Sequence, residues 1–221
     1  MPNNFPAAVL WDMDGTLIDS EPFWLLSETR LANDYGGSWT EENGHELIGK
    51  SLYDSSALLR DRLSIKDLTV EQVIDRLTDE VVSHLKGSLP WRPGALELLM
   101  DLKQHGVKTA LVTMSMRRMA LAVVAEIPFH AFDVVVAGDD VRMGKPDPEP
   151  YLKAAALLGV DPRDCVALED SKTGLASAEA AGTVAIGVTN IVPIPAGPNR
   201  IVIPTLKNLT TDSLAKLSAN V

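Results

Sequence analysis

Two aspartates, Asp12 and Asp14, stand two positions apart directly after the apolar run Ala8–Trp11, and Gly15 follows them. An apolar run that stops at a glycine predicts a buried strand ending in a tight turn. Side chains at positions i and i+2 leave a strand on the same side, so the two carboxylates can share one small site. Carboxylates this close repel each other unless they share a proton or a cation lies between them. The pair predicts a Mg²⁺ site, since Mg²⁺ usually binds through one or two carboxylates, and aspartates that cap a helix are the structural alternative.

Further polar side chains follow later apolar runs or lie in tight loops. Thr113 follows one apolar run, and Glu169 and Asp170 follow another. Lys145 stands in the proline-flanked segment Gly144–Pro148. Ligands of parallel α/β sheets bind beyond the carboxyl ends of the strands, which would bring these residues together. Each also has a structural interpretation, because threonine and aspartate often cap helices or turns and lysine is usually a solvated surface residue.

These segments together resemble the haloacid dehalogenase-like phosphohydrolases. The sequence DMDGT at residues 12–16 is similar to the first motif of that family, DxDGT, and three later segments are similar to its other motifs in the same order. The resemblance implies that Asp12 attacks phosphorus, and that Asp14 protonates the leaving oxygen and later activates water. It implies that Lys145 neutralises the nucleophile and the transferring phosphate, and that Thr113 holds phosphoryl oxygens.

The resemblance also implies Mg²⁺ as the cofactor. The ion would be held by Asp12, the backbone carbonyl of Asp14 and Asp170, with Glu169 either ligating it or lying just beyond its ligands. The substrate would be a small phosphorylated metabolite. Its binding residues are predicted in the loops after two strands, on the following helix and in the inserted segment, namely Gly15, Thr16, Met114, Ser115, Arg117, Trp24 and Lys50.

The chain as a whole predicts an α/β fold with two parts. Near-continuous apolar runs alternate with helical segments, which predicts a Rossmann-like, doubly wound parallel sheet with helices on both faces. Between residues 20 and 89, apolar side chains recur at helical spacing and no segment has the pattern of a buried strand. We therefore predict a core of residues 1–19 and 90–221 and an inserted all-helical cap of residues 20–89, which resembles the cap of the β-phosphoglucomutase-like and sugar-phosphatase-like branch.

Hydrolysis is favoured over two other functions on this fold. A β-phosphoglucomutase carries a cap histidine twelve positions after the nucleophile and an arginine three positions after a cap glycine. Here these positions hold Trp24 and Leu52. A catalytically idle binding protein is disfavoured because the four motif residues are intact, and dehalogenation is disfavoured because Asp14 is present. A phosphosugar mutase and an idle binding or regulatory protein remain the alternatives.

Composition limits the partners. The chain has 221 residues with 20 basic and 30 acidic side chains, a net charge of −10, which disfavours nucleic acids and anionic membranes as partners. One cysteine, Cys165, cannot form an internal disulfide, and no apolar run approaches the length of a membrane span or a signal peptide. We therefore expect a cytoplasmic protein, and the length is compatible with a monomer.

Overall fold

A six-stranded parallel sheet forms the centre of the computed structural model, which describes residues 5–197 and 200–219. Residues 1–4, 198–199 and 220–221, which the sequence assigned to the core, lie outside the described residues. Neighbouring strands pair in the order β3-β2-β1-β4-β5-β6, and every pairing is parallel. The strands are β1 (Ala8–Trp11), β2 (Lys108–Val112), β3 (Val134–Val136), β4 (Cys165–Glu169), β5 (Val184–Val188) and β6 (Arg200–Ile203).

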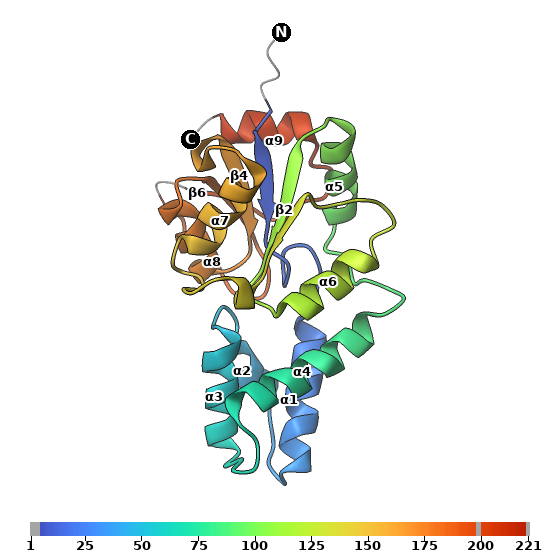
Figure 1. Cartoon of the computed structure of the whole chain (residues 1–221), viewed down its shortest axis with the longest axis vertical. Helices are drawn as coiled ribbons and strands as arrows, with labels where there is room; N and C mark the ends of the chain where they lie inside the picture. Colours follow the sequence, from blue (N-terminus) through green and yellow to red (C-terminus); the bar gives the residue numbers. More distant parts are fainter. Residues whose placement is uncertain (1–4, 198–199, 220–221) are drawn as a thin grey trace.

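Helices cover both faces of this sheet (Figure 1). Strand β1 shows the principle, because alternate side chains of a strand point to opposite faces. Ala8 and Leu10 belong to one buried apolar cluster, and Val9 and Trp11 belong to the other. The first cluster is covered by α7 (Glu149–Leu158) and α8 (Lys172–Ala180); the second is covered by α5 (Ala95–Gln104), α6 (Arg117–Ala125) and α9 (Thr211–Ser218). The predicted doubly wound α/β fold is confirmed.

Four helices between β1 and α5 form a separate lobe below the sheet in Figure 1. They are α1 (Glu21–Asp34), α2 (Glu41–His45), α3 (Leu52–Arg62) and α4 (Val70–Leu85). Hydroxyls of Thr40, Ser51 and Thr69 accept hydrogen bonds from backbone N–H groups at the starts of α2, α3 and α4, which satisfies otherwise unpaired donors. Helix α4 packs against α1 and α3 through an apolar stripe, and we refer to this lobe as the cap.

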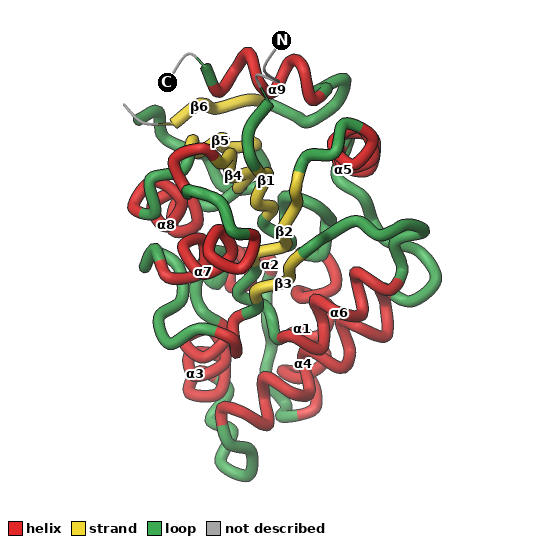
Figure 2. Tube along the Cα trace, turned by 45° about the horizontal axis from the view of Figure 1, so that its top comes forward, coloured by secondary structure: helices red, strands yellow, loops and turns green. Residues whose placement is uncertain are grey.

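The cap lies against the core on two sides of the sheet's carboxyl edge. On one side α4 packs against α6, and Arg118 of α6 pairs with Asp75 and Asp79 of α4. On the other side the Thr173 hydroxyl donates to the backbone carbonyl of Gly49 at 2.9 Å. Figure 2 shows α1, α4 and α6 running close together where the two lobes meet. The cap is therefore held over the edge where the sequence places the polar residues.

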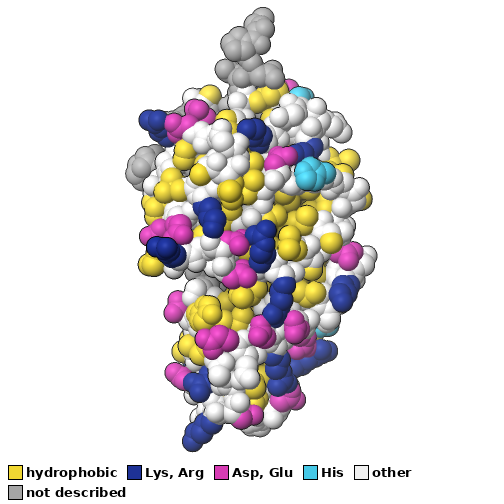
Figure 3. Space-filling view, in the orientation of Figure 1, with side chains coloured by type: hydrophobic (Ala, Val, Ile, Leu, Met, Phe, Trp, Pro, Cys, Tyr) yellow, Lys and Arg dark blue, Asp and Glu magenta, His cyan; other side chains and the backbone are white. Residues whose placement is uncertain are grey.

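The surface carries both signs of charge. Figure 3 shows acidic and basic side chains interspersed over both lobes on this face of the molecule. None of the described helices is long and apolar enough to span a membrane.

Candidate active site

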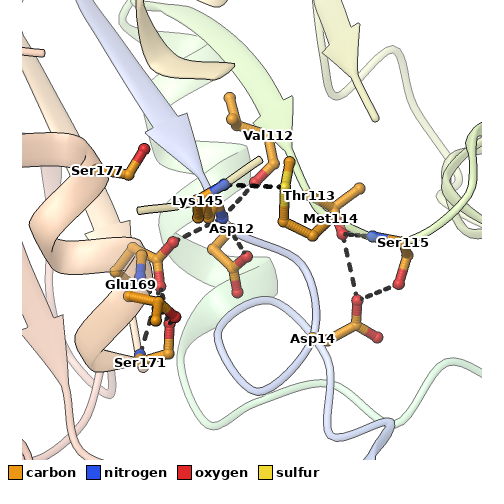
Figure 4. A network of polar contacts seen from close by, with 12 residues as sticks. Asp12, Asp14, Val112, Thr113, Met114, Ser115, Lys145, Glu169, Ser171 and Ser177 are labelled. Atoms are coloured by element: carbon orange, nitrogen blue, oxygen red, sulfur yellow. Dashed lines mark hydrogen bonds and ion pairs between the residues drawn. The ribbon is translucent and has the colours of Figure 1, made fainter. Parts of the chain in front are cut away.

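The carboxyl ends of the three central strands bring the predicted residues together. Asp12 directly follows β1, and its backbone N–H donates to Leu168 of β4. Thr113 directly follows β2, and Glu169 is the last residue of β4. Strand β1 lies between β2 and β4, at the point where the connections change direction, which is where ligands bind in sheets of this type. Lys145 reaches the same place from the loop before α7 (Figure 4).

Lys145 is the buried cation of this site. Its Nζ lies 2.7 Å from Asp12 Oδ1 and 2.6 Å from Glu169 Oε1, and it donates to the backbone carbonyl of Val112 at 2.9 Å. Burial opposes the charged form, but the carboxylates of Asp12 and Glu169 outweigh it and hold the pKa of Lys145 above its ordinary value. The lysine is therefore charged and can neutralise a neighbouring anion during reaction.

Three buried carboxylates surround a space suited to a divalent cation. Asp12, Glu169 and Asp170 place one oxygen each within 4.8 Å of one another. Burial and then the charge of Glu169 raise the pKa of Asp12, and the same two causes raise that of Asp170 to about 7. One ammonium, that of Lys145, faces three carboxylates, so the cluster has an excess of negative charge. An all-oxygen donor set with this excess fits Mg²⁺, and Asn190 orients one ligand by donating to Asp170 at 3.0 Å.

Two glycines leave room for these carboxylates. Gly15 has a φ of +85°, and a Cβ there would lie 2.0 Å from Asp170 Oδ2. At Gly174, in α8, a Cβ would lie 1.9 Å from Glu169 Oε1. Because Gly15 and Gly174 have no Cβ, the carboxylates of Asp170 and Glu169 can lie directly against the backbone at these two positions.

Gly174→Ala is expected to weaken activation by Mg²⁺ by about 10- to 100-fold, the usual effect of displacing a group that supports a metal ligand. The added methyl group must push the fully buried Glu169 carboxylate away from Lys145. The half-saturating Mg²⁺ concentration for the phosphate release that the motifs predict measures this effect. An unchanged Mg²⁺ dependence would contradict a supporting role for Glu169.

The side chain of Asp14 lies outside the acidic cluster. Ser20 and Trp24 donate to its Oδ1 at 2.5 and 3.3 Å, and Ser115 and Thr113 donate to its Oδ2 at 2.7 and 3.3 Å. Asp12 and Asp14 both line the cavity described below, but the Asp14 carboxyl group is not one of the three that form the acidic cluster. Ser20 and Trp24 hold it from the side of the cap, and Thr113 and Ser115 hold it from the loop after β2. A metal-binding role for the backbone carbonyl of Asp14 stays a prediction.

A cavity of about 420 Å³ extends from these residues into the cap. This volume is in the range of small-molecule sites. Nine of the predicted residues line it. Five are the predicted catalytic and metal-binding residues Asp12, Asp14, Thr113, Lys145 and Asp170, and four are the predicted substrate residues Trp24, Lys50, Met114 and Ser115.

Three predicted substrate residues, Gly15, Thr16 and Arg117, are not among the residues that line the cavity. The Arg117 guanidinium pairs with Asp140 at 2.5 Å, so a surface carboxylate already holds it. Thr16 is fully buried, and Gly15 lies against the Asp170 carboxylate. The geometry thus supports loop and cap residues as substrate contacts, and gives no support to these three.

The comparison with known families fits this geometry. Residues 6–182 match the family model described as haloacid dehalogenase-like hydrolase, which covers most of the chain. The chain is a haloacid dehalogenase-like hydrolase. The resemblance seen in the sequence motifs is confirmed.

Relatives of this haloacid dehalogenase-like hydrolase include several phosphatases. It is 37% identical over 176 residues to the phosphorylated carbohydrates phosphatase of Thermotoga maritima, covering 79% of this chain and 81% of the relative. It is 32% identical over 216 residues to hexitol phosphatase B of Escherichia coli O157:H7, covering 96% and 94%. Among solved structures, CbbY of Rhodobacter sphaeroides in complex with phosphate superposes with a TM-score of 0.84 at 26% identity, covering 95% and 99%.

The structure adds residues that sequence reasoning missed in this hydrolase. The segment Ser20–Pro22 has the pattern of a helix start, yet Ser20 makes no side-chain capping bond and donates to Asp14 instead. Asn190 follows β5, so the strand-end rule that found Asp170 applies to it too. Tyr151 donates to Glu169 at 2.7 Å from the first turn of α7, where nothing in the sequence pattern distinguishes it from a core residue.

Glu21, in the first turn of α1, is another residue of the site that the sequence pattern does not distinguish. It lines the cavity, and burial, followed by the charge of Asp14, raises its pKa to about 8. A carboxyl with this pKa is largely protonated at neutral pH and can donate a hydrogen bond to a ligand.

Proposed function

We propose that this haloacid dehalogenase-like hydrolase is a Mg²⁺-dependent phosphatase. Its substrate is a small phosphorylated metabolite, a sugar phosphate or similar phosphomonoester, and the reaction proceeds through an aspartyl phosphate. The observation that carries the proposal is the contact of Lys145 with both Asp12 and Glu169 at the floor of the cavity. The names of the relatives, which include a phosphorylated carbohydrates phosphatase and hexitol phosphatases, support the same chemistry.

In the first step an Asp12 carboxylate oxygen attacks phosphorus, and the bond between phosphorus and the leaving oxygen breaks. Asp14 gives a proton to the departing oxygen, so that an alcohol leaves. Lys145, held against Asp12, offsets the repulsion between the carboxylate and the phosphoryl group. Asp14 must be protonated when substrate binds, and the hydroxyls of Ser20, Thr113 and Ser115 can hold its carboxyl group in either protonation state because a hydroxyl both donates and accepts.

In the second step water hydrolyses the aspartyl phosphate. Asp14, now deprotonated, takes a proton from the water as its oxygen attacks phosphorus. The bond between phosphorus and the Asp12 oxygen breaks, which releases inorganic phosphate and restores the Asp12 carboxylate. The cap excludes bulk water during the first transfer and must admit one water molecule for the second.

Mg²⁺ would be held by Asp12, Asp170 and the backbone carbonyl of Asp14, with Glu169 beside them. When bound, it supplies positive charge against the phosphoryl oxygens and the carboxylates.

The single cysteine, Cys165, is buried and free, which supports a location in the reducing cytoplasm.

A phosphosugar mutase is the weaker alternative. The Trp24 indole contacts Asp14 at the position where mutases have a histidine, and Leu52 lines the cavity where they have an arginine. Neither side chain can grip a second phosphate, as the turning of a bisphosphate intermediate requires.

Phosphate release from a panel of sugar phosphates, phosphoglycolate and nucleotides, with Mg²⁺ and with EDTA, tests the proposed function. We expect Mg²⁺-dependent release that clusters on hydroxyl-rich phosphomonoesters and falls at least about 100-fold in EDTA, because only the Lys145 ammonium then offsets the charge of the three carboxylates and the phosphate. Undiminished release in EDTA would contradict the metal requirement. Release only with a bisphosphate primer would favour the mutase.

A further inference from the structure

The cap side of the cavity is rich in carboxyl groups. Three glutamates of the cap line the cavity, Glu21, Glu28 and Glu41. Glu21 lies near Asp14 and Asp170, whose charges act on it, whereas Glu28 lies about two turns further along α1.

The basic residues of the cap that line the cavity are Lys50 and His45, and both are exposed. Glu41 and Lys50 are exposed, so water screens their charges. Glu28 is 6% exposed, which makes its charge the least screened of the three glutamates.

Glu28 uses only one of its two oxygens within the protein. The Trp39 indole N–H donates to its Oε2 at 2.8 Å. Among the described residues no hydrogen bond reaches its Oε1, although the side chain lines the cavity. Gly44 of α2 lies against the same carboxyl group, since a Cβ there would be 3.4 Å from Oε2. Oε1 is not one of the fully buried atoms without a partner, so it is accessible from the cavity, where a ligand group can donate a hydrogen bond to it in place of water.

We infer that Glu28 selects the substrate by its end remote from phosphate: Glu28 accepts a hydrogen bond from a hydroxyl or ammonium there and excludes a second anionic group. The inference rests on the proposed phosphatase function and narrows its substrate class to phosphomonoesters with an uncharged or cationic remote end. A carboxylate or second phosphate would meet the Glu28 carboxyl in a poorly screened space with no buried cation of the cap to offset it.

The chemistry of the buried carboxyl agrees with this role. Burial raises the pKa of Glu28 to about 7, against the opposing hydrogen bond from Trp39. The carboxylate that excludes an anion is therefore the main form only above this pKa, so the substrates are compared at about pH 8.5, where most of the group is ionised. A hydroxyl suits either form, because it both donates and accepts hydrogen bonds.

The test uses four six-carbon substrates that differ only at the carbon remote from the 6-phosphate: glucitol 6-phosphate, 1-amino-1-deoxyglucitol 6-phosphate, gluconate 6-phosphate and glucitol 1,6-bisphosphate. We measure kcat/KM for each with the wild type and with Glu28→Gln. The wild type is expected to prefer the hydroxyl and amine substrates over the carboxylate and bisphosphate by at least about 30-fold. In Glu28→Gln this preference is expected to fall at least tenfold, chiefly through KM, because the amide can keep the Trp39 bond with its oxygen and turn its NH₂ group to the cavity.

The preference is a ratio within one variant, so a uniform loss of activity does not alter it. Glu42→Gln is the matched control, because Glu42 is exposed on the same cap and does not line the cavity; its preference should equal that of the wild type. Activity with an unchanged preference in Glu28→Gln would overturn the inference and leave the phosphatase function standing. No release from any of the four by a wild type that hydrolyses another phosphomonoester of the panel would overturn the inference alone, whereas no release from any member of the panel would overturn the phosphatase function.

Discussion

Asp12→Asn is expected to lower phosphate release by roughly 10⁴-fold or more, the scale found when the nucleophile of a covalent catalyst is removed. An amide oxygen is too weak a nucleophile to form the aspartyl phosphate. The Lys145 ammonium, which contacts the carboxylates of Asp12 and Glu169, would then contact only one carboxylate, that of Glu169. The measurement is turnover of the preferred substrate with saturating Mg²⁺, together with the yield of acid-trapped phosphoenzyme.

The same variant is expected to keep a melting temperature close to that of the wild type. Asparagine retains an oxygen that can accept the hydrogen bond from Lys145, and the repulsion of Asp12 by Glu169 and Asp170 is relieved. Asp34→Asn is the control, because Asp34 forms an exposed pair with Arg76 far from the cavity lining. Residual activity above a few per cent in Asp12→Asn would exclude Asp12 as the nucleophile.

The sheet and the edge that carries the active-site residues could be predicted from the sequence, because one physical rule governs both. Strands buried on two faces must be apolar almost throughout, so β1, β2 and β4 stand out as runs of apolar residues. In a parallel sheet, the polar residues directly after such runs meet at one edge. This rule places Asp12 and Asp170 together without knowledge of any side-chain conformation.

Side-chain partners that come from distant segments were not predictable in this way. The carboxyl group of Asp14 is oriented by Ser20 and Trp24 and by residues about a hundred positions later in the chain. Arg117 follows the second motif as a phosphate-binding arginine would, but Asp140 lies beside it and pairs with it. Spacing along one segment gives the face on which a residue lies, whereas the pairing partner depends on how two segments pack.

The cap illustrates the same limit for specificity. Helical periodicity identified residues 20–89 as helical, since burial of one stripe per helix leaves that pattern. The hydrogen bond between Glu28 of α1 and Trp39 of the loop before α2 leaves no periodic pattern in the sequence, because one glutamate in a helix is ordinarily a solvated residue. Only the packed structure distinguishes the buried Glu28 from the exposed Glu41 and Glu42.

Lys145→Met is expected to destabilise the protein by about 3–5 kcal/mol, the cost of removing one partner from a buried ion pair. Methionine preserves much of the side-chain volume, but the Asp12 and Glu169 carboxylates would lose the ammonium between them. For a chain of this length the melting temperature should fall by roughly 6–20 °C. Turnover should also fall by about 10²-fold or more, since the charge on the transferring phosphoryl group loses its fixed cation.

Added Mg²⁺ separates the electrostatic cause from a packing defect in Lys145→Met. With the lysine gone, the three carboxylates of Asp12, Glu169 and Asp170 bind a divalent cation with less competition, so Mg²⁺ should raise the variant's melting temperature more than that of the wild type. Lys103→Met is the control, because the Lys103–Asp133 pair is partly exposed and its loss should cost no more than about 1 kcal/mol. If Mg²⁺ raised the melting temperatures of Lys145→Met and of the wild type equally, the loss of stability would come from packing. Lys145 would then not balance the charge of the acidic cluster.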